Sequence, residues 1–194
     1  MNFLKIQLTK KNTLNVVYKD GANNIVTVNG ANIVHKDLKQ AMNGLIPHIA
    51  MITEQRETQG RTLKQVEADR ITDANSQSVY KLMTVDTVTI NDDQTTVMLT
   101  GNRILQTMDV ITINTPNIEV ANREKYKYGD ELDLAVDAVK YEAKLYLDEQ
   151  KWGVKEGDLQ FADDDPFKGV KADEVESADI KPAKRGRKAK KEAV

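Results

Sequence analysis

The strongest constraint on the fold is a change of hydrophobic period along the chain. Apolar residues first alternate with polar ones, as at Leu4, Ile6 and Leu8, which is the period of a strand with one buried face. Turn-forming residues follow each such segment, at Lys11-Asn12, Asp20-Gly21 and Asn29-Gly30. The first third of the chain therefore predicts three or four short antiparallel strands.

A helical period replaces this alternation over residues 35–55. Apolar residues there recur every three or four positions, at Leu38, Ala41, Met42, Leu45, Ile49 and Ile52. Gly44 and Pro47 interrupt the stripe, which predicts a kink or a break near Ile46. His35 and His48 are expected to be cap or surface residues.

The same succession returns later in the chain. Residues 79–115 are rich in β-branched side chains and contain turn signals at 91–94 and 101–102. A second apolar stripe over 130–150 predicts another helix, capped by Asp130. Residues 56–78 between the two parts lack an apolar pattern, so we expect a functional arm, a β-excursion or disorder there.

Together these patterns predict an α+β domain with a twisted antiparallel sheet of about six to eight short strands and two helices. A duplicated β-meander-plus-helix unit fits this order, and so do two unrelated halves. The length of 194 residues suits one domain with extensions. We assign residues 1–152 to the domain, including a polar arm at 56–78, and 153–194 to a disordered tail.

Composition narrows the classes of protein. The chain has no cysteine, which excludes disulfides, thiol catalysis and thiolate metal sites. Its first residues mix lysine into an apolar pattern, unlike a signal peptide, and no apolar run has the length of a membrane span. The expected location is the cytoplasm, away from membranes.

The tail separates its charges into two blocks. Residues 156–180 carry nine Asp or Glu and two Lys, a net charge of −7. Residues 181–194 carry seven Lys or Arg and one Glu, a net charge of +6. Because the body is nearly neutral, this zwitterionic tail is the main electrostatic feature of the chain.

Catalytic motifs are not recognisable. No pair of carboxylates has acid–base spacing, and the acidic turn at 91–94 lacks the Gly and Glu of a calcium loop. The glycines between residues 21 and 30 lack the lysine of a phosphate loop. We therefore expect a protein that is not an enzyme and needs no cofactor or metal.

The basic block contains Arg-Gly-Arg, with Lys188 where proline usually follows in an AT-hook. It resembles that motif, whose arginines enter the narrow minor groove of A·T-rich DNA. The resemblance implies DNA contacts by Lys184, Arg185, Gly186, Arg187, Lys188, Lys190 and Lys191. The alternative is a solubilising tail.

The acidic block contains an Asp run followed by Pro and Phe. The residues Asp163, Asp164, Asp165, Pro166 and Phe167 resemble the acidic tip of bacterial single-stranded DNA-binding proteins. The resemblance implies recruitment of replication or recombination proteins. Here the motif is internal, and a plain acidic linker is the alternative.

Two parts of the body are further candidates for DNA contact. Exposed strand side chains are expected at Lys5, Gln7, Asn15, Lys19, Thr87, Thr89, Thr112 and Asn114. An aromatic-basic cluster, suited to base stacking or to simple packing, comprises Arg123, Lys125, Tyr126, Lys127 and Tyr128. By analogy the predicted fold is similar to the whirly and PC4-like single-stranded DNA-binding folds.

Two functions follow as hypotheses. The first is a non-enzymatic DNA-binding accessory protein of phage or bacterial replication or recombination, which favours single strands and forms a homo-oligomer. The second is a phage or bacterial structural or assembly protein that oligomerises through its sheet and carries an inert charged tail.

Overall fold

An antiparallel sheet with helices on one face is the frame of the protein. The computed structural model describes residues 1–55, 58–72 and 82–153, which belong to a unit spanning residues 1–158. Seven strands of this part form one sheet, in the order β3-β2-β1-β4-β5-β6, and β7 pairs with β5. Their bounds are β1 (Asn2–Leu8), β2 (Thr13–Lys19), β3 (Ile25–Ile33), β4 (Met83–Ile90), β5 (Thr96–Ile104), β6 (Val110–Asn114) and β7 (Ile118–Glu119). The predicted α+β class is confirmed.

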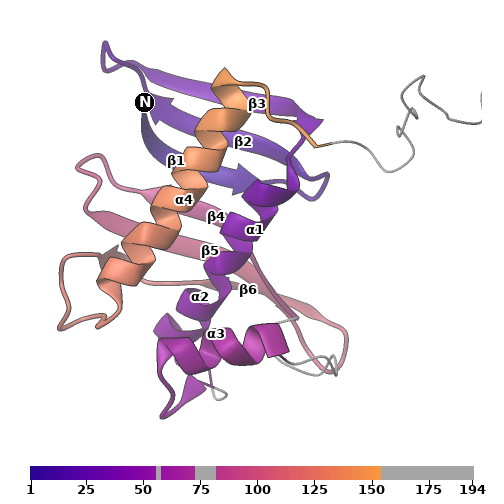
Figure 1. The fold of residues 1–194 in the computed structure, drawn as a ribbon, viewed down its shortest axis with the longest axis vertical. Helices are drawn as coiled ribbons and strands as arrows, with labels where there is room; N and C mark the ends of the chain where they lie inside the picture. Colours follow the sequence, from indigo (N-terminus) through magenta and orange to yellow (C-terminus); the bar gives the residue numbers. More distant parts are fainter. Residues whose placement is uncertain (56–57, 73–81, 154–194) are drawn as a thin grey trace, which may run out of the picture. The chain divides into compact units, whose positions relative to one another are not determined.

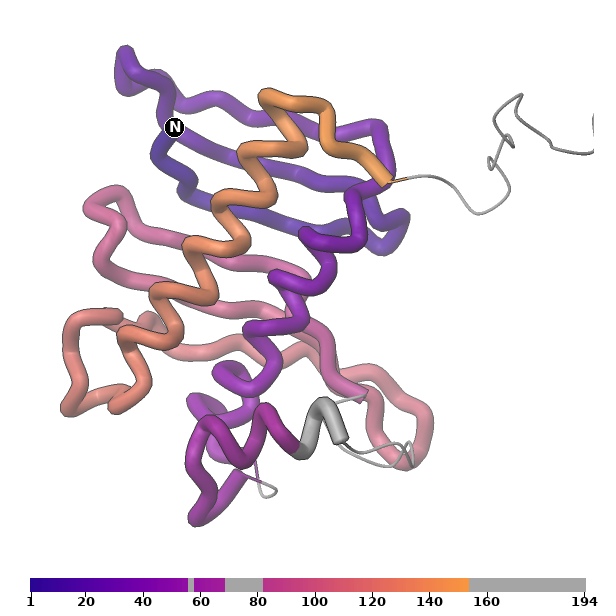
Figure 2. The backbone as a smooth tube through the Cα atoms, viewed as in Figure 1, coloured from indigo at the N-terminus to yellow at the C-terminus, as the bar shows by residue number. Residues whose placement is uncertain are grey.

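The helices are α1 (Lys36–Gly44), α2 (Ile46–Ile52), α3 (Leu63–Thr72) and α4 (Gly129–Asp148). Figure 1 shows α1 and α4 lying across the same face of the sheet. The tube in Figure 2 shows that the two helices run in opposite directions. The opposite face of the sheet carries no helix in the described part of the chain.

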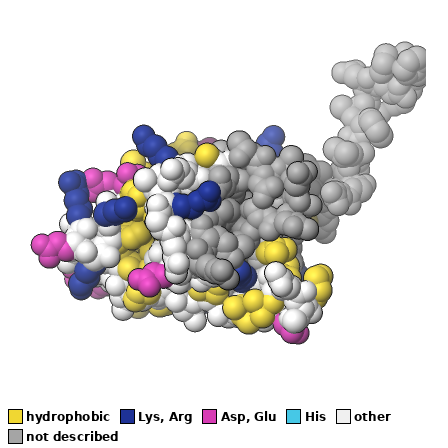
Figure 3. All heavy atoms as spheres, turned by 90° about the horizontal axis from the view of Figure 1, so that it is seen from below, with side chains coloured by type: hydrophobic (Ala, Val, Ile, Leu, Met, Phe, Trp, Pro, Cys, Tyr) yellow, Lys and Arg dark blue, Asp and Glu magenta, His cyan; other side chains and the backbone are white. Residues whose placement is uncertain are grey.

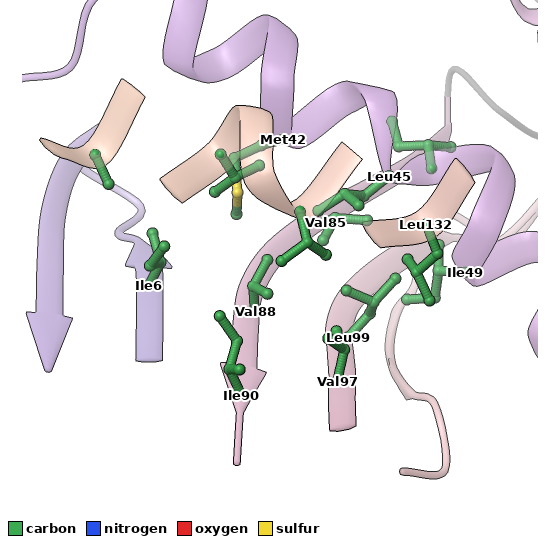
Figure 4. Packing of buried hydrophobic residues seen from close by; sticks show 14 of the residues in the cluster. Ile6, Met42, Leu45, Ile49, Val85, Val88, Ile90, Val97, Leu99 and Leu132 are labelled. Atoms are coloured by element: carbon green, nitrogen blue, oxygen red, sulfur yellow. The ribbon is translucent and has the colours of Figure 1, made fainter. Parts of the chain in front are cut away.

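The core lies between this helical layer and the sheet. Alternate strand residues point into it, and both predicted helical stripes are buried against them. Figure 4 shows Met42 and Leu45 of the first stripe facing Val85 and Val88 of the central strand β4. The core is wholly aliphatic at its centre, with Ile6, Leu45, Ile49, Val88 and Leu132 fully buried.

The two halves of the sheet repeat one plan. Each half is a meander of three strands followed by a helix, and β1 and β4 meet as an antiparallel central pair with Ile6 opposite Val88. The strand order is therefore symmetric about this pair. A β-bulge interrupts β1 between Phe3 and Lys5, and another interrupts β4 between Val85 and Thr87.

The turns follow the same repeat. Asn12 in the β1–β2 turn and Gln94 in the β4–β5 turn both have positive φ. Asn23 and Met108 do so in the second turn of each half. Because bulges and left-handed turn residues recur at matching places, the structure favours the duplicated meander-plus-helix reading over two unrelated halves.

The predicted helix break is confirmed and lies at Leu45. Leu45 is both the C-cap of α1 and the N-cap of α2. Pro47 occupies the first turn of α2, where its missing N–H is tolerated. His35 caps α1, since its Nδ1 accepts the Asp37 backbone N–H at 3.3 Å. His48 is not on the surface: it is 2% exposed and lies within α2.

Three local expectations need correction. Helix α4 begins at Gly129 with Tyr128 as its cap, so Asp130 lies in the first turn instead. Strand β5 continues through Gly101, so this residue is not a turn. Glycine is needed there because a side chain would collide with the carbonyl oxygen of Thr84 beside the β4 bulge. The short β7, which pairs with Thr96 and Val97, has no counterpart in the sequence prediction.

The polar arm is partly a helix. Thr62 and Gln65 form a capping box at the start of α3, in which the Thr62 N–H donates to the Gln65 Oε1 at 2.9 Å. Leu63 and Val66 are buried. Residues 56–57 and 73–78 of the arm lie outside the described residues, as do residues 79–81 and the predicted acidic and basic blocks of the tail.

Candidate nucleic-acid interface

The uncovered face of the sheet carries a row of uncharged polar side chains. Strand pairing sets Asn15 opposite Gln7, Gln7 opposite Thr87, and Thr87 opposite Thr100. The outer strands extend this order, because Asn29 pairs with Asn15 and Asn114 with Thr100. We call these residues the polar row: Asn29, Asn15, Gln7, Thr87, Thr100 and Asn114.

Hydroxyl and amide groups of this row can both donate and accept hydrogen bonds. One such bond is already formed inside it, from the Thr100 hydroxyl to the Asn114 Oδ1 at 2.8 Å. All eight strand residues expected to be exposed lie on this face, since Lys5 pairs with both Thr89 and Val17, and Thr112 with Asn102. The expected exposure is wrong for Thr87, which is only 7% exposed because it lies on the central strand β4 between Gln7 and Thr100. The other members of the row offer neutral hydrogen-bonding groups on the strands that flank it.

A cleft of about 640 Å³ opens beside the row, at one end of the β1–β4 pair. The β1–β2 turn forms one wall, helix α1 contributes a rim, and the sheet forms the floor. Residues on these three parts include Lys10 and Asn12, Lys39 and Asn43, and Gln7, Asp86, Thr87, Thr100, Asn102 and Thr112. A volume of this size lies in the range of small-ligand pockets.

The floor of the cleft has its own hydrogen-bond network. Asn102 donates to the carboxylate of Asp86, the bulged residue of β4. The Thr112 hydroxyl donates to the Asn102 Oδ1 at 3.1 Å. These bonds hold the Asn102 side chain in one orientation, in which its NH2 group donates to Asp86.

The two ends of the β1–β4 pair differ in charge. The β1–β2 turn is basic, with Lys10 and Lys11, whereas the β4–β5 turn is acidic, with Asp92 and Asp93. At the acidic end, Lys19 forms an ion pair with Asp92, and Gln94 donates to the backbone of Phe3 at 2.9 Å. That end is closed by these contacts.

The basic end stays open. In the second half of the sheet, Asn102 occupies the position equivalent to Lys19 of the first half. Its side chain donates to Asp86 instead of reaching the β1–β2 turn. Lys10 and Lys39 have no ion-pair partner among the described residues. The cleft thus presents two ammonium groups above a polar floor whose one negative charge, on Asp86, is hydrogen-bonded to Asn102 but not neutralised by it.

The predicted aromatic-basic cluster is only partly exposed. Tyr126 is 8% exposed, and its hydroxyl lies 2.9 Å from the Nδ1 of His48. Its ring also meets the Tyr128 ring edge-on at 5.8 Å. Tyr126 is a core residue, which corrects the expectation that it offers its ring to a base.

The charged residues of the cluster have separate surroundings. Arg123 pairs with Asp130 at 2.6 Å, and the Lys127 ammonium lies 4.7 Å from the centre of the Tyr128 ring. Lys125 is exposed. These residues lie in one loop, as the sequence predicted, but none of them lines the cleft.

Burial changes the acid–base properties of the buried pair. Loss of hydration lowers the pKa of His48 from 6.5 to about 4 and raises the pKa of Tyr126, because each group is held in its neutral form. Both groups are occupied with each other, so the pair stabilises the contact between α2 and the loop before α4.

Figure 3 shows Lys and Arg side chains on the underside of the molecule standing apart, among Asp, Glu and hydrophobic side chains. Within residues 1–55, 58–72 and 82–153, no three His, Asp or Glu side chains are grouped to hold a metal ion. None of the helices in the same ranges has both the length and the apolar character that a bilayer span requires.

Sequence reasoning missed the cleft residues Lys10, Lys39, Asp86 and Asn102. The Lys10-Lys11 turn was a usable signal, because two cations at a hairpin tip contrast with the acidic tip of the other half. The tail candidates, Lys184 to Lys191 and Asp163 to Phe167, lie outside the described residues.

In comparisons with known proteins, no family model, curated protein or solved structure matches the chain.

Proposed function

We propose that this is a non-enzymatic DNA-binding accessory protein of phage or bacterial replication or recombination, and that it favours single strands. The observation that carries the proposal is the open cleft, in which Lys10 and Lys39 lie at the edge of the polar row without an ion-pair partner in the part of the chain that the structure describes. Ammonium groups beside side chains that donate and accept hydrogen bonds are what a sugar-phosphate chain requires.

In this proposal, one backbone phosphate occupies the cleft between the β1–β2 turn and α1. The neighbouring sugars and bases run along the polar row, where amides such as Asn15 and Gln7 contact base edges that are unpaired in a single strand. A duplex offers fewer such edges because its bases are already paired. This difference is the source of the preference for single strands.

The open face carries no aromatic ring among the described strand residues, since Phe3 and Tyr18 pack together on the helix side at 6.1 Å. Binding therefore depends on phosphates and hydrogen bonds more than on base stacking. Lys125 and Lys127 add affinity from the loop before α4 through phosphate contacts.

The tail acts in two ways in the proposal. The basic residues Lys184, Arg185, Arg187 and Lys188 add salt-dependent affinity for any nucleic acid. The acidic segment from Asp163 to Phe167 recruits replication or recombination partners or competes with DNA for the basic groups.

The test is a titration of labelled single-stranded and double-stranded DNA with the full chain at several salt concentrations. The double variant Lys10→Gln/Lys39→Gln removes both cleft cations, and Lys11→Gln/Lys64→Gln removes two exposed cations that do not line the cleft. Loss of the contact with this one phosphate should flatten the plot of log affinity against log salt by about 0.7 for a single strand.

The control variant should retain most of the affinity. A tail variant with Lys184, Arg185, Arg187 and Lys188 changed to Gln separates the contribution of the tail. If the full chain binds neither DNA at low salt, the proposed function is wrong. If both lysine pairs matter equally and both DNAs bind alike, the cleft has no part in recognition.

Assembly through the sheet is a second candidate, favoured by the outer strands. Neither β3 nor β6 carries a charged residue, and charge is a common protection of free sheet edges. Continuous sheets through β3 or β6 would give an oligomer that charged substitutions at Thr27 or Thr112 abolish, as measured by light scattering.

A further inference from the structure

The outward face of α4 carries an apolar stripe that no other described element covers. Leu134 and Tyr141 are 71% and 61% exposed, Ala138 between them is exposed, and Leu145 is half-buried. Their spacing of four, three and four residues places all of them on one side of a helix.

This stripe is separate from the buried face of the same helix. Leu132, Val136, Val139 and Ala143 point into the core. Helix α4 is therefore apolar on two sides, although a helix that only covers a sheet needs one. An apolar seam with this spacing is the pattern by which one helix packs against another.

Charges beside the seam specify the orientation of its partner. Asp137 and Lys144 lie on the same flank, seven residues apart, and both are exposed. The Asp137 side chain is 60% exposed and makes only a local pair with Lys140 at 3.0 Å. The acidic group lies toward the beginning of the seam and the basic group toward its end.

We propose that this face binds α4 of a second copy of the chain in an antiparallel pair. A two-fold axis between Ala138 and Tyr141 sets Leu134 against Leu145 of the second copy, and Ala138 against its Tyr141. With a rise of about 1.5 Å per residue, Asp137 then lies within about 3 Å, along the axis, of Lys144 of the second copy. The symmetry forms this attraction twice.

A parallel pair gains nothing from the same charges. It would direct Asp137 towards Glu142 of the second copy, which is a repulsion, and Lys144 towards Glu149, which is an attraction. Glu142 is already held by Lys151 of its own chain at 2.8 Å, on the side of α4 nearer the body. At the centre of the seam the Asp137–Lys144 attraction therefore favours the antiparallel arrangement, whereas at its ends Asp130 and Glu131 come level with the acidic residues Glu149 and Asp148 of the second copy.

The pairing leaves the polar row and its cleft free. Helix α4 lies on the covered face of the sheet, whereas the polar row lies on the other face (Figure 1). A dimer would carry two outward-facing polar rows and two clefts. Formation of this dimer does not depend on DNA binding.

The test is sedimentation equilibrium of the full chain over a wide concentration range. We expect a monomer–dimer equilibrium that Leu134→Glu/Tyr141→Glu weakens by at least about tenfold. The matched control Gln40→Glu/Lys64→Glu introduces the same two residues on exposed positions of α1 and α3 and should leave the equilibrium unchanged. Circular dichroism checks that each variant is folded.

A charge exchange tests the orientation. Asp137→Lys and Lys144→Asp should each weaken the dimer, and the two together should restore it. A chain that stays monomeric at all concentrations overturns the proposal. A dimer that is insensitive to Leu134→Glu/Tyr141→Glu, or a charge exchange without recovery, overturns it as well, because the contact then lies elsewhere or runs in another register.

Discussion

The Nδ1 atom of His48 lies 2.9 Å from the hydroxyl oxygen of Tyr126, and the two side chains are 2% and 8% exposed. The contact joins residues 78 positions apart in the sequence and fastens α2 to the loop that precedes α4. Since both groups are buried in neutral form, it makes the stability of the domain dependent on pH and on the tyrosine hydroxyl.

Lowering the pH should destabilise the domain at pH values well above those at which carboxylates become protonated. The imidazole has a pKa of 6.5 when unfolded and about 4 when buried at His48. Between these values the unfolded chain binds more protons, so the free energy of unfolding falls as the pH decreases. The expected loss is about 2 kcal/mol between about pH 7 and pH 5.

Urea unfolding at both pH values measures this loss, with His48→Gln as the control. The variant should lose most of the difference between the two pH values. An unchanged difference in His48→Gln would assign the pH dependence to other groups.

Removal of the Tyr126 hydroxyl should destabilise the fold. Tyr126→Phe keeps the ring packed against Tyr128 but leaves the His48 Nδ1 without its partner. The expected cost is about 1–3 kcal/mol, the penalty for an unsatisfied buried polar group. Tyr141→Phe serves as control in thermal unfolding, because that residue is 61% exposed; equal effects of the two substitutions would refute the explanation.

Gly101 should tolerate no side chain. Gly101→Ala would drive a Cβ into the Thr84 carbonyl oxygen and so disturb the pairing of β4 with β5. We expect a loss of more than about 2 kcal/mol in the free energy of unfolding. Gly44→Ala is the matched control, since nothing lies within 4 Å of a Cβ there. It sits at the end of α1 and should be neutral or stabilising by up to about 1 kcal/mol.

Lys151 should contribute stability that salt removes. Its ammonium lies 2.7 Å from Asp37 of α1 and 2.8 Å from Glu142 of α4, and these partners raise its pKa to about 12. Lys151→Gln should lower the urea midpoint at low salt and have a smaller effect at about 1 M salt, where screening acts within about 3 Å. An effect of equal size at both salt concentrations would point to lost packing of the lysine stem instead.

Local patterns were sufficient for most of the elements. Alternation at Leu4, Ile6 and Leu8 predicted β1, and Pro47 after Gly44 predicted the break between α1 and α2. Such signals can be read from the sequence because the hydrophobic period of a strand or helix depends only on residues a few positions apart. Helix α3 was missed altogether, although its capping box, Thr62 with Gln65, was present in the sequence.

Which side chains meet was decided only by the tertiary structure. Tyr126 looked like a surface residue among Arg123, Lys125 and Lys127, but docking against His48 buries it. The cleft depends on Lys10 from a turn, Lys39 from a helix and Asn102 from a strand of the other half. No local pattern connects those positions.

The sequence alone established the charge blocks of the tail and most of the strands, helices and turns, though not α3, β7 or the continuity of β5 at residues 101–102. These features depend on residues that are close along the chain. Folding decided that β1 and β4 pair at the centre of the sheet, that Lys19 closes one end of this pair, and that Asn102 leaves the other end open. These contacts depend on register and on distant partners, which periodicity does not encode.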